Sequence, residues 1–280
     1  MKRIIYRSLI FIFFLISIFV IYLSTIGIET NRFNNQIENI IKDYDEDLNI
    51  ELKKIKIVLD PLNLEINVKT IGPKLQSKKK AIEIERVQTQ IAINSLINNN
   101  FSLKNLEIST KSLEIKNLIS FVRSFKNTPE LYLLEKIFKR GHLVSDINIE
   151  FDKEGKITEN YKVKGFIKNA KISLLKKYNL DRINLIFDFK KNEYKFTEVD
   201  LLLNNLSLFS KEIYVKSLQK NFLVNGSIEN KNTSFDDEIF QRLINSYFKN
   251  LEFKKIDLNF KNKFSFKIDK NYKFSDLEIS

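Results

Sequence analysis

The longest uncharged segment of the chain lies at its start, at residues 8–28. As an α-helix it would be about 31 Å long at about 1.5 Å per residue, which matches the hydrocarbon core of a bilayer. A cleavable signal peptide usually has a shorter apolar core and a small-residue cleavage site, whereas this segment ends in Ser24-Thr25-Ile26-Gly27. We therefore expect residues 1–28 to be a transmembrane signal anchor.

Charges on the two sides of this segment predict its orientation. Lys2, Arg3 and Arg7 precede it, and acidic residues follow it from Glu29 onward. Basic residues stay on the cytoplasmic side of single spans. The N-terminus is therefore expected in the cytoplasm and the rest of the chain outside it.

Beyond the anchor, the spacing of apolar residues predicts one helix and then a series of strands. Residues 31–44 repeat at helical spacing, which indicates an amphipathic helix. From Asn49 onward the period is two, with Lys53-Lys54 read as a bulge. The alternating runs are Ile50/Leu52, Ile55/Ile57/Leu59, Leu62/Leu64/Ile66/Val68, Ile82/Ile84, Ile91/Ile93, Phe101/Leu103, Leu106/Ile108 and Leu113/Ile115. Short strands in succession, without helices between them, favour an antiparallel meander over a βαβ architecture.

A helical hairpin or kinked helix is predicted in the middle of the chain. Apolar residues repeat at helical spacing over residues 118–125, and Thr128-Pro129-Glu130 supplies an N-cap followed by a first-turn proline. Gly141 is expected as the C-cap, which places His142 at a helix end. The boundary between two β regions, residues 29–142 and 143–280, is placed after this element.

Alternation returns and lengthens in the second region. Its runs are Ile147/Ile149/Phe151, Tyr161/Val163/Gly165/Ile167, Ile183/Leu185/Phe187/Phe189, Val199/Leu201/Leu203, Ile213/Val215, Phe222/Val224/Gly226/Ile228, Ile256/Leu258/Phe260, Phe264/Phe266/Ile268 and Leu277/Ile279. Ser234-Phe235-Asp236-Asp237 is read as the start of one further helix, at residues 234–250. The last strand reaches Ser280 without a polar tail, so we expect an uncovered sheet edge and a fragment of a longer chain.

The amino-acid composition argues against most kinds of catalytic site. The chain has no Cys, one His and only 6 Gly, so we expect neither a catalytic triad, a metal site, a nucleotide-binding loop nor a bound cofactor. The net charge of +12 accompanies an abundance of Lys, Asn, Ile and Phe, a pattern typical of AT-rich coding sequences. Nucleic acid is not an expected partner, because the basic region lies outside the cytoplasm. The chain is therefore not expected to be an enzyme.

The alternating apolar stripes allow two interpretations. They are either core packed against a second layer, or one face of a long curved antiparallel sheet that forms a groove for lipid acyl chains. The residues that we expect to line such a groove are Ile147, Ile149, Phe151, Val163, Ile167, Ile183, Leu185, Phe187 and Phe189. Alternation alone does not say which face is concave.

The order of these features resembles the AsmA-like proteins of Gram-negative inner membranes. The resemblance lies in the basic start and single span, in residues 49–62, 82–87 and 96–108, and in two strand-glycine-strand units at residues 163–170 and 224–228. It implies a mainly β, groove-forming periplasmic protein that moves phospholipid towards the outer membrane. Members of that family are often much longer than this chain.

These expectations together predict a function in the cell envelope. The chain is expected to be a single-pass inner-membrane protein whose periplasmic β-groove binds phospholipid acyl chains, in lipid transport or outer-membrane biogenesis and maintenance. The alternative is a structural or assembly factor that docks an envelope protein through its exposed last strand.

Overall fold

A computed structural model describes residues 2–32, 34–44, 46–94, 103–152, 156–174, 178–204, 206–235, 256–269, 271 and 273–280. The helices are α1 (Lys2–Thr25), α2 (Asn34–Tyr44), α4 (Ile115–Phe125) and α5 (Pro129–Ile137). The strands are β1 (Ile28–Thr30), β2 (Leu48–Glu51), β3 (Ile55–Asp60), β4 (Glu65–Ile71), β5 (Lys74–Ser77), β6 (Lys80–Ala92), β7 (Leu103–Thr110), β8 (Leu113–Glu114), β9 (Phe138–Phe151), β10 (Ile157–Leu174), β11 (Tyr178–Lys190), β12 (Glu193–Leu203), β13 (Leu206–Ser217), β14 (Asn221–Phe235), β15 (Ile256–Asp269) and β16 (Phe274–Ile279).

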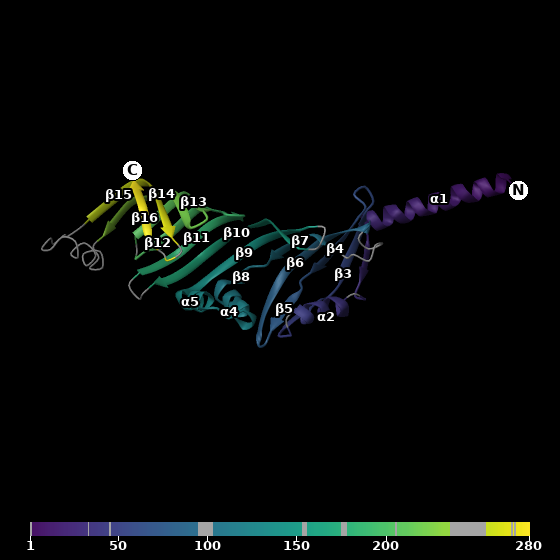
Figure 1. Cartoon of the computed structure of the whole chain (residues 1–280), viewed down its shortest axis with the longest axis horizontal. Coiled ribbons are helices and arrows are strands. Elements are labelled where there is room, and N and C mark those ends of the chain that lie inside the picture. Colours follow the sequence, from purple (N-terminus) through teal and green to yellow (C-terminus); the bar gives the residue numbers. More distant parts are fainter. Residues whose placement is uncertain are drawn as a thin grey trace. The chain divides into compact units, whose positions relative to one another are not determined.

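The strands form one open antiparallel sheet, which confirms the predicted mainly β fold behind an N-terminal apolar helix (Figure 1). Its hydrogen-bonded order is β1-β3-β4-β6-β7-β9-β10-β11-β12-β13-β14-β15-β16, with β2 and β5 branching from β6 and β8 pairing with β9. Neighbouring strands in this path follow one another closely in the chain. The meander expected from the two-residue periodicity is therefore present.

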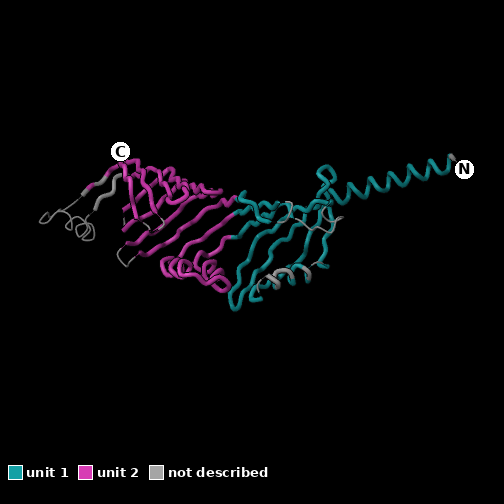
Figure 2. Tube along the Cα trace, in the orientation of Figure 1, with its two compact units in different colours: residues 1–111, 146–161 teal, residues 112–145, 162–280 magenta. Residues whose placement is uncertain are grey.

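The chain divides into two compact units (Figure 2). Unit 1 contains residues 1–111 and 146–161, and unit 2 contains residues 112–145 and 162–280. The helical hairpin thus belongs with the later strands, whereas the sequence analysis placed it with the earlier ones. Strand β9 contributes residues to both units.

In unit 1, the predicted amphipathic helix α2 packs on the sheet. Ile37 of α2 contacts a buried cluster made of Ile50, Leu52 and Ile55. Ile55 has only 1% of its surface exposed, so this cluster is the centre of the core of unit 1. Helix α1 is the opposite case, because it is exposed along its length and is long and apolar enough to cross a membrane.

In unit 2, α4 covers one end of the sheet. Ile115 and Ile119 of α4 form a buried cluster with Ala170 of β10 and Ile183 of β11. Thr128 caps α5 as predicted, accepting a hydrogen bond from the backbone N–H of Leu131. The amphipathic pattern of residues 118–125 therefore predicted a real contact, made with the strands that follow it.

Three local predictions are wrong. Leu62 and Leu64 lie in the turn between β3 and β4, because the strand begins only at Glu65. Lys53-Lys54 is no bulge within one strand but lies between β2 and β3, which have different partners. Ser234 and Phe235 end β14, opposite Asp257 and Ile256, and do not begin a helix. The rest of the predicted last helix lies outside the described residues.

Gly141 and His142 are also placed differently from the prediction, since both lie in β9. Helix α5 ends at Ile137, and His142 pairs with Glu114 of β8. Gly141 has a φ of +134°, and a Cβ there would lie 2.6 Å from the Cβ of Ala170. The glycine is therefore needed for close packing of two strands and does not terminate the helix.

Candidate functional site

The strand register of unit 2 places apolar residues from successive strands opposite one another. One set, which we call the first apolar row, contains Gly165, Phe187, Phe196, Ile213, Gly226, Phe264 and Ile279. The second apolar row, two residues away, contains Val163, Phe189, Tyr194, Val215, Val224 and Phe266. Because side chains separated by two residues share a face, both rows lie on one face of the sheet.

The residues between the two rows are mostly polar or charged. This charged row contains Lys164, Asp188, Lys195, Tyr214, Asn225, Ser265 and Glu278. Its side chains must project from the other face, since they alternate with those of the apolar rows. The sheet of unit 2 therefore has one apolar face and one charged face.

Aromatic rings pack side by side within the apolar rows. The ring of Phe189 lies 4.9 Å from that of Phe187, 5.5 Å from that of Tyr194 and 5.4 Å from that of Phe196, measured between centroids. Phe264 and Phe266 form a second stacked pair at 5.8 Å. These contacts shield Phe187, which is 5% exposed, while Phe189, Phe196, Phe264 and Phe266 stay partly exposed.

Helix α4 covers the neighbouring part of the same face. Ile167 and Leu185, which pair with each other next to the first apolar row, pack on the buried cluster beneath α4. Within the residues that the structure describes, this cluster includes no member of either apolar row. The apolar face thus continues beyond the area that α4 covers.

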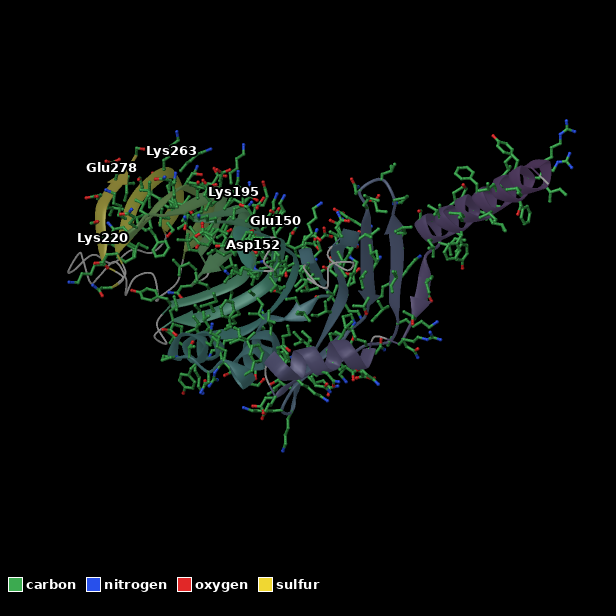
Figure 3. All side chains as sticks on the ribbon, turned by 45° about the vertical axis from the view of Figure 1, so that its right-hand side comes forward. Glu150, Asp152, Lys195, Lys220, Lys263 and Glu278 are labelled. Carbon is green, nitrogen blue, oxygen red and sulfur yellow. The ribbon has the colours of Figure 1, made fainter. Side chains whose placement is uncertain are left out.

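Ion pairs occupy the charged face. Lys164 contacts Asp188 at 3.3 Å, Lys195 contacts Glu212 at 2.6 Å and Lys267 contacts Asp276 at 2.8 Å, measured from nitrogen to oxygen. The side chains of this face, with Lys195 and Lys263 labelled, are drawn in Figure 3.

These contacts affect titration on the charged face. The hydrogen bond and charge of Asp276 raise the pKa of Lys267, and a hydrogen bond with Glu193 raises the pKa of the Tyr214 phenol. Both groups keep their protons at neutral pH. The charged face therefore carries solvated ion pairs, which suits contact with water.

Two glycines in the first apolar row make room for phenylalanine rings. A Cβ at Gly165 would lie 2.7 Å from Cζ of Phe187, and one at Gly226 would lie 2.8 Å from Cζ of Phe264. In each case the ring comes from the residue directly opposite on the next strand. These are the glycines of the two strand-glycine-strand units, and their role is to let an aromatic ring lie flat across the strand.

Gly165→Ala is expected to destabilise the chain more than Gly226→Ala does. The added Cβ at Gly165 would also lie 2.1 Å from the carbonyl oxygen of Val144, which belongs to the backbone and cannot turn away. At Gly226 the nearest backbone atom is 3.1 Å away, and the Phe264 ring can shift. We expect a loss of about 2–3 kcal/mol for Gly165→Ala and about 1 kcal/mol for Gly226→Ala. Denaturant unfolding of the full chain in detergent, followed by circular dichroism, measures both; equal losses would contradict the assignment.

The sheet of unit 1 also has apolar rows across its strands, and their residues are mostly aliphatic. One row across its sheet contains Ile28, Ile57, Val68, Thr89, Leu106 and Ile149, and the next contains Thr30, Ile55, Thr70, Val87, Ile108 and Ile147. Lysine, glutamine and glutamate alternate with them, as at Lys69, Gln88 and Glu107. Unit 1 therefore also has one apolar and one polar face.

The predicted groove residues lie in different environments in the structure. Ile147 and Ile149 belong to the rows of unit 1, and Phe151 is partly exposed at the end of β9. Val163, Phe187 and Phe189 belong to the apolar rows of unit 2. Ile183 is 6% exposed beneath α4, and Ile167 and Leu185 border that cluster, so these residues form core and not open surface.

Sequence reasoning omitted Tyr194 and Phe196 from the candidates. Both residues lie at the centre of the apolar face, opposite Phe189 and Phe187. Lys191-Asn192 forms a two-residue turn between β11 and β12, and Asn192 has a φ of +58°. An asparagine between two alternating runs is the sequence signal for such a turn. A two-residue hairpin fixes the register of the strands beside it.

The described residues include no candidate metal site. Among them, no group of three His, Asp or Glu side chains lies close enough to bind a metal ion. No protein-family model matches the sequence, and a search of curated proteins finds no match either. The apolar face is accordingly the main candidate functional feature.

Proposed function

We propose that this chain is a membrane-anchored envelope protein of the AsmA-like type, whose apolar face binds the acyl chains of phospholipids. The observation that carries the proposal is the pair of apolar rows, which run without a charged residue from β10 to β16 in the first row and from β10 to β15 in the second. In this proposal α1 spans the inner membrane with its N-terminus in the cytoplasm, and the sheet lies in the periplasm. The protein moves phospholipid or maintains the outer membrane.

The size of the face suits an acyl chain. Strands lie about 4.8 Å apart, so a row from β10 to β16 is about 29 Å long when followed along the sheet. The hydrocarbon core of a bilayer is about 30 Å thick and contains two acyl chains end to end. One row therefore offers more than enough length for a single chain.

The chemistry of the face also suits an acyl chain. Burial of each methylene contributes about 0.8 kcal/mol, without any need for a directional contact. The rings of Phe189, Phe196 and Phe266 present partly exposed apolar surface. A headgroup would remain in water beyond the edge of the rows, which requires no specific pocket.

A nearby source of lipid favours this occupant over a second protein layer. Helix α1 is long and apolar enough to hold the chain in a bilayer. Phospholipid is then present at high local concentration wherever the anchor lies. Because the anchor would already hold the protein at the bilayer, binding of a lipid to the apolar face would cost the protein little further translational freedom.

The test is the phospholipid that stays bound to the full chain. The protein is extracted from membranes in detergent, washed in lipid-free detergent until free lipid is removed, and its lipid content is measured by mass spectrometry. The proposal predicts phospholipid in constant proportion to protein, displaced by added fatty acid. A protein free of lipid after the same wash, with its fold intact, would contradict it.

A second candidate function rests on the edge strand β16. All of its residues are exposed, with Phe274 at 70%, Leu277 at 63% and Ile279 at 64%. An exposed apolar edge is suited to pairing with a strand of another protein. In this alternative the chain is a structural or assembly factor, and a photoreactive residue at position 277 would form adducts with protein and not with lipid.

A further inference from the structure

The turn between β3 and β4 exposes leucine to an unusual degree. Leu62 has 93% of its surface exposed and Leu64 has 57%. Pro61 and Asn63 complete this turn, which we call the β3–β4 turn (residues 61–64), and both are exposed. A turn on a soluble surface is normally built from Gly, Asn, Asp and Ser, so two exposed leucines need an explanation.

The register of unit 1 places this turn beside the end of α1. Strand β1 runs antiparallel to β3, with Ile28 opposite Ile57. The residues that precede β1 therefore lie beside the later residues of β3, which lead to Asp60 and the turn. Gly27 lies against β3, since a Cβ there would be 2.4 Å from the carbonyl oxygen of Ile57. Helix α1 ends at Thr25, and Figure 1 shows the turn near that end.

We propose that the β3–β4 turn inserts into the headgroup and acyl boundary of the same bilayer that α1 spans. This inference rests on the membrane anchor of the proposed function, and it goes beyond it by naming a second membrane contact. The bilayer boundary is about where the apolar segment of α1 stops, because the segment and the hydrocarbon core have similar lengths. The same boundary is then the depth at which Leu62 lies.

Hydrogen bonds within the turn pair polar groups that would otherwise face the hydrocarbon. One carboxylate oxygen of Asp60 accepts hydrogen bonds from the backbone N–H groups of Leu62 and Asn63, each at 3.1 Å. The other accepts one from Nδ2 of Asn63 at 2.9 Å. The bonds from Asn63 lower the pKa of the Asp60 carboxyl, which keeps it an acceptor at neutral pH. Polar backbone groups near hydrocarbon must be paired in this way.

The backbone at Leu64 has a conformation that leucine seldom adopts. Its φ is +53°, in the left-handed region that Gly and Asn adopt more readily than leucine. A leucine in this conformation is justified if its side chain contributes a contact that glycine cannot make. Insertion into lipid would supply such a contact.

A cation lies close to the base of the turn. Lys104 of β7 contacts Glu65, the residue after the turn, at 2.6 Å from nitrogen to oxygen. The Lys104 side chain is 60% exposed although that of Glu65 is 9% exposed. A lysine at this depth is suited to a phosphate headgroup while Leu62 reaches the acyl chains.

The absence of cysteine from the sequence makes the test direct, because any introduced thiol is unique. Leu62→Cys is labelled with an environment-sensitive fluorophore, and the full chain is placed in vesicles of phosphatidylethanolamine and phosphatidylglycerol. Lys79→Cys is the matched control, since it lies in the β5–β6 turn at the other end of β6 from the β3–β4 turn. Both positions are exposed, so labelling leaves the fold intact.

Nitroxide groups attached to lipid at the level of the headgroup and upper acyl chain are expected to quench most of the fluorescence at position 62. Aqueous quenchers are expected to act mainly at position 79. If the protein stays with the vesicles while position 62 is quenched only from water, the turn does not insert and the anchor is unaffected. If the protein does not stay with the vesicles, the anchor fails and this inference fails with it.

Discussion

Phe196→Asp is expected to remove most of the phospholipid bound to the full chain. Phe196 lies in the first apolar row between Phe187 and Ile213, and its side chain is partly exposed. The change removes about 2 kcal/mol of apolar contact, which corresponds to about thirtyfold in affinity. A carboxylate among hydrocarbon chains adds a further desolvation cost. Bound phospholipid per protein, measured by mass spectrometry, reports the loss.

Ile186→Asp is the matched control. Ile186 is 50% exposed and pairs with Phe166 and Thr197 on the charged face. The substitution exchanges an apolar side chain for the same carboxylate in the same unit, so the two variants differ in the face they alter. We expect Ile186→Asp to retain its lipid. Equal loss from both variants, with unchanged unfolding midpoints, would show that lipid does not bind at the apolar rows.

The structure also identifies substitutions that would not test the proposal. Phe187 is 5% exposed and Leu185 borders the buried cluster beneath α4. A charge at either position would disrupt packing before it affected a ligand, at a cost of several kcal/mol. Loss of lipid from such a variant would therefore report unfolding.

Phe14→Arg combined with Leu15→Arg is expected to release the protein from membranes. Both residues lie near the centre of the candidate span at residues 3–25 and are exposed. Each arginine costs about 2.5–3.5 kcal/mol at the centre of an inserted helix, so the pair lowers the insertion equilibrium more than about a thousandfold. The fraction of protein that resists extraction with alkaline carbonate measures this loss.

Ser8→Arg combined with Thr25→Arg introduces the same two charges near the ends of α1. Arginine near the end of a span extends its charge to the interface and leaves insertion intact. The control is therefore expected to stay in the membrane fraction. Carbonate-resistant binding of the central double variant would contradict the idea that α1 spans the bilayer.

Side-chain alternation predicted the strands well because half-buried strands need it. Runs such as Ile183/Leu185/Phe187/Phe189 fall within one strand of the structure. Alternation does not show where a strand shifts its register, however. The pairing is irregular between Asp181 and Ile186, and Ile183 packs beneath α4 whereas Phe187 lies in the first apolar row. The sequence therefore named both as groove residues although only one belongs to the apolar rows.

Contacts between distant strands account for the other differences. Gly141 has the spacing of a helix C-cap, but the close approach of Ala170 determines its role. Leu62 continues the alternation of β4, but the hydrogen bonds of Asp60 form a turn there. In both cases a local pattern was outweighed by packing or by side-chain hydrogen bonds that periodicity does not reveal.

The most direct test of the apolar face is a scan along β12 with a photoreactive amino acid. It is introduced singly at Tyr194, Lys195, Phe196 and Thr197, and the full chain is irradiated in cell membranes. The proposed function predicts phospholipid adducts from positions 194 and 196, on the apolar face, and far fewer from positions 195 and 197, on the charged face. Adducts of equal yield at all four positions, or adducts only within the protein at positions 194 and 196, would contradict it.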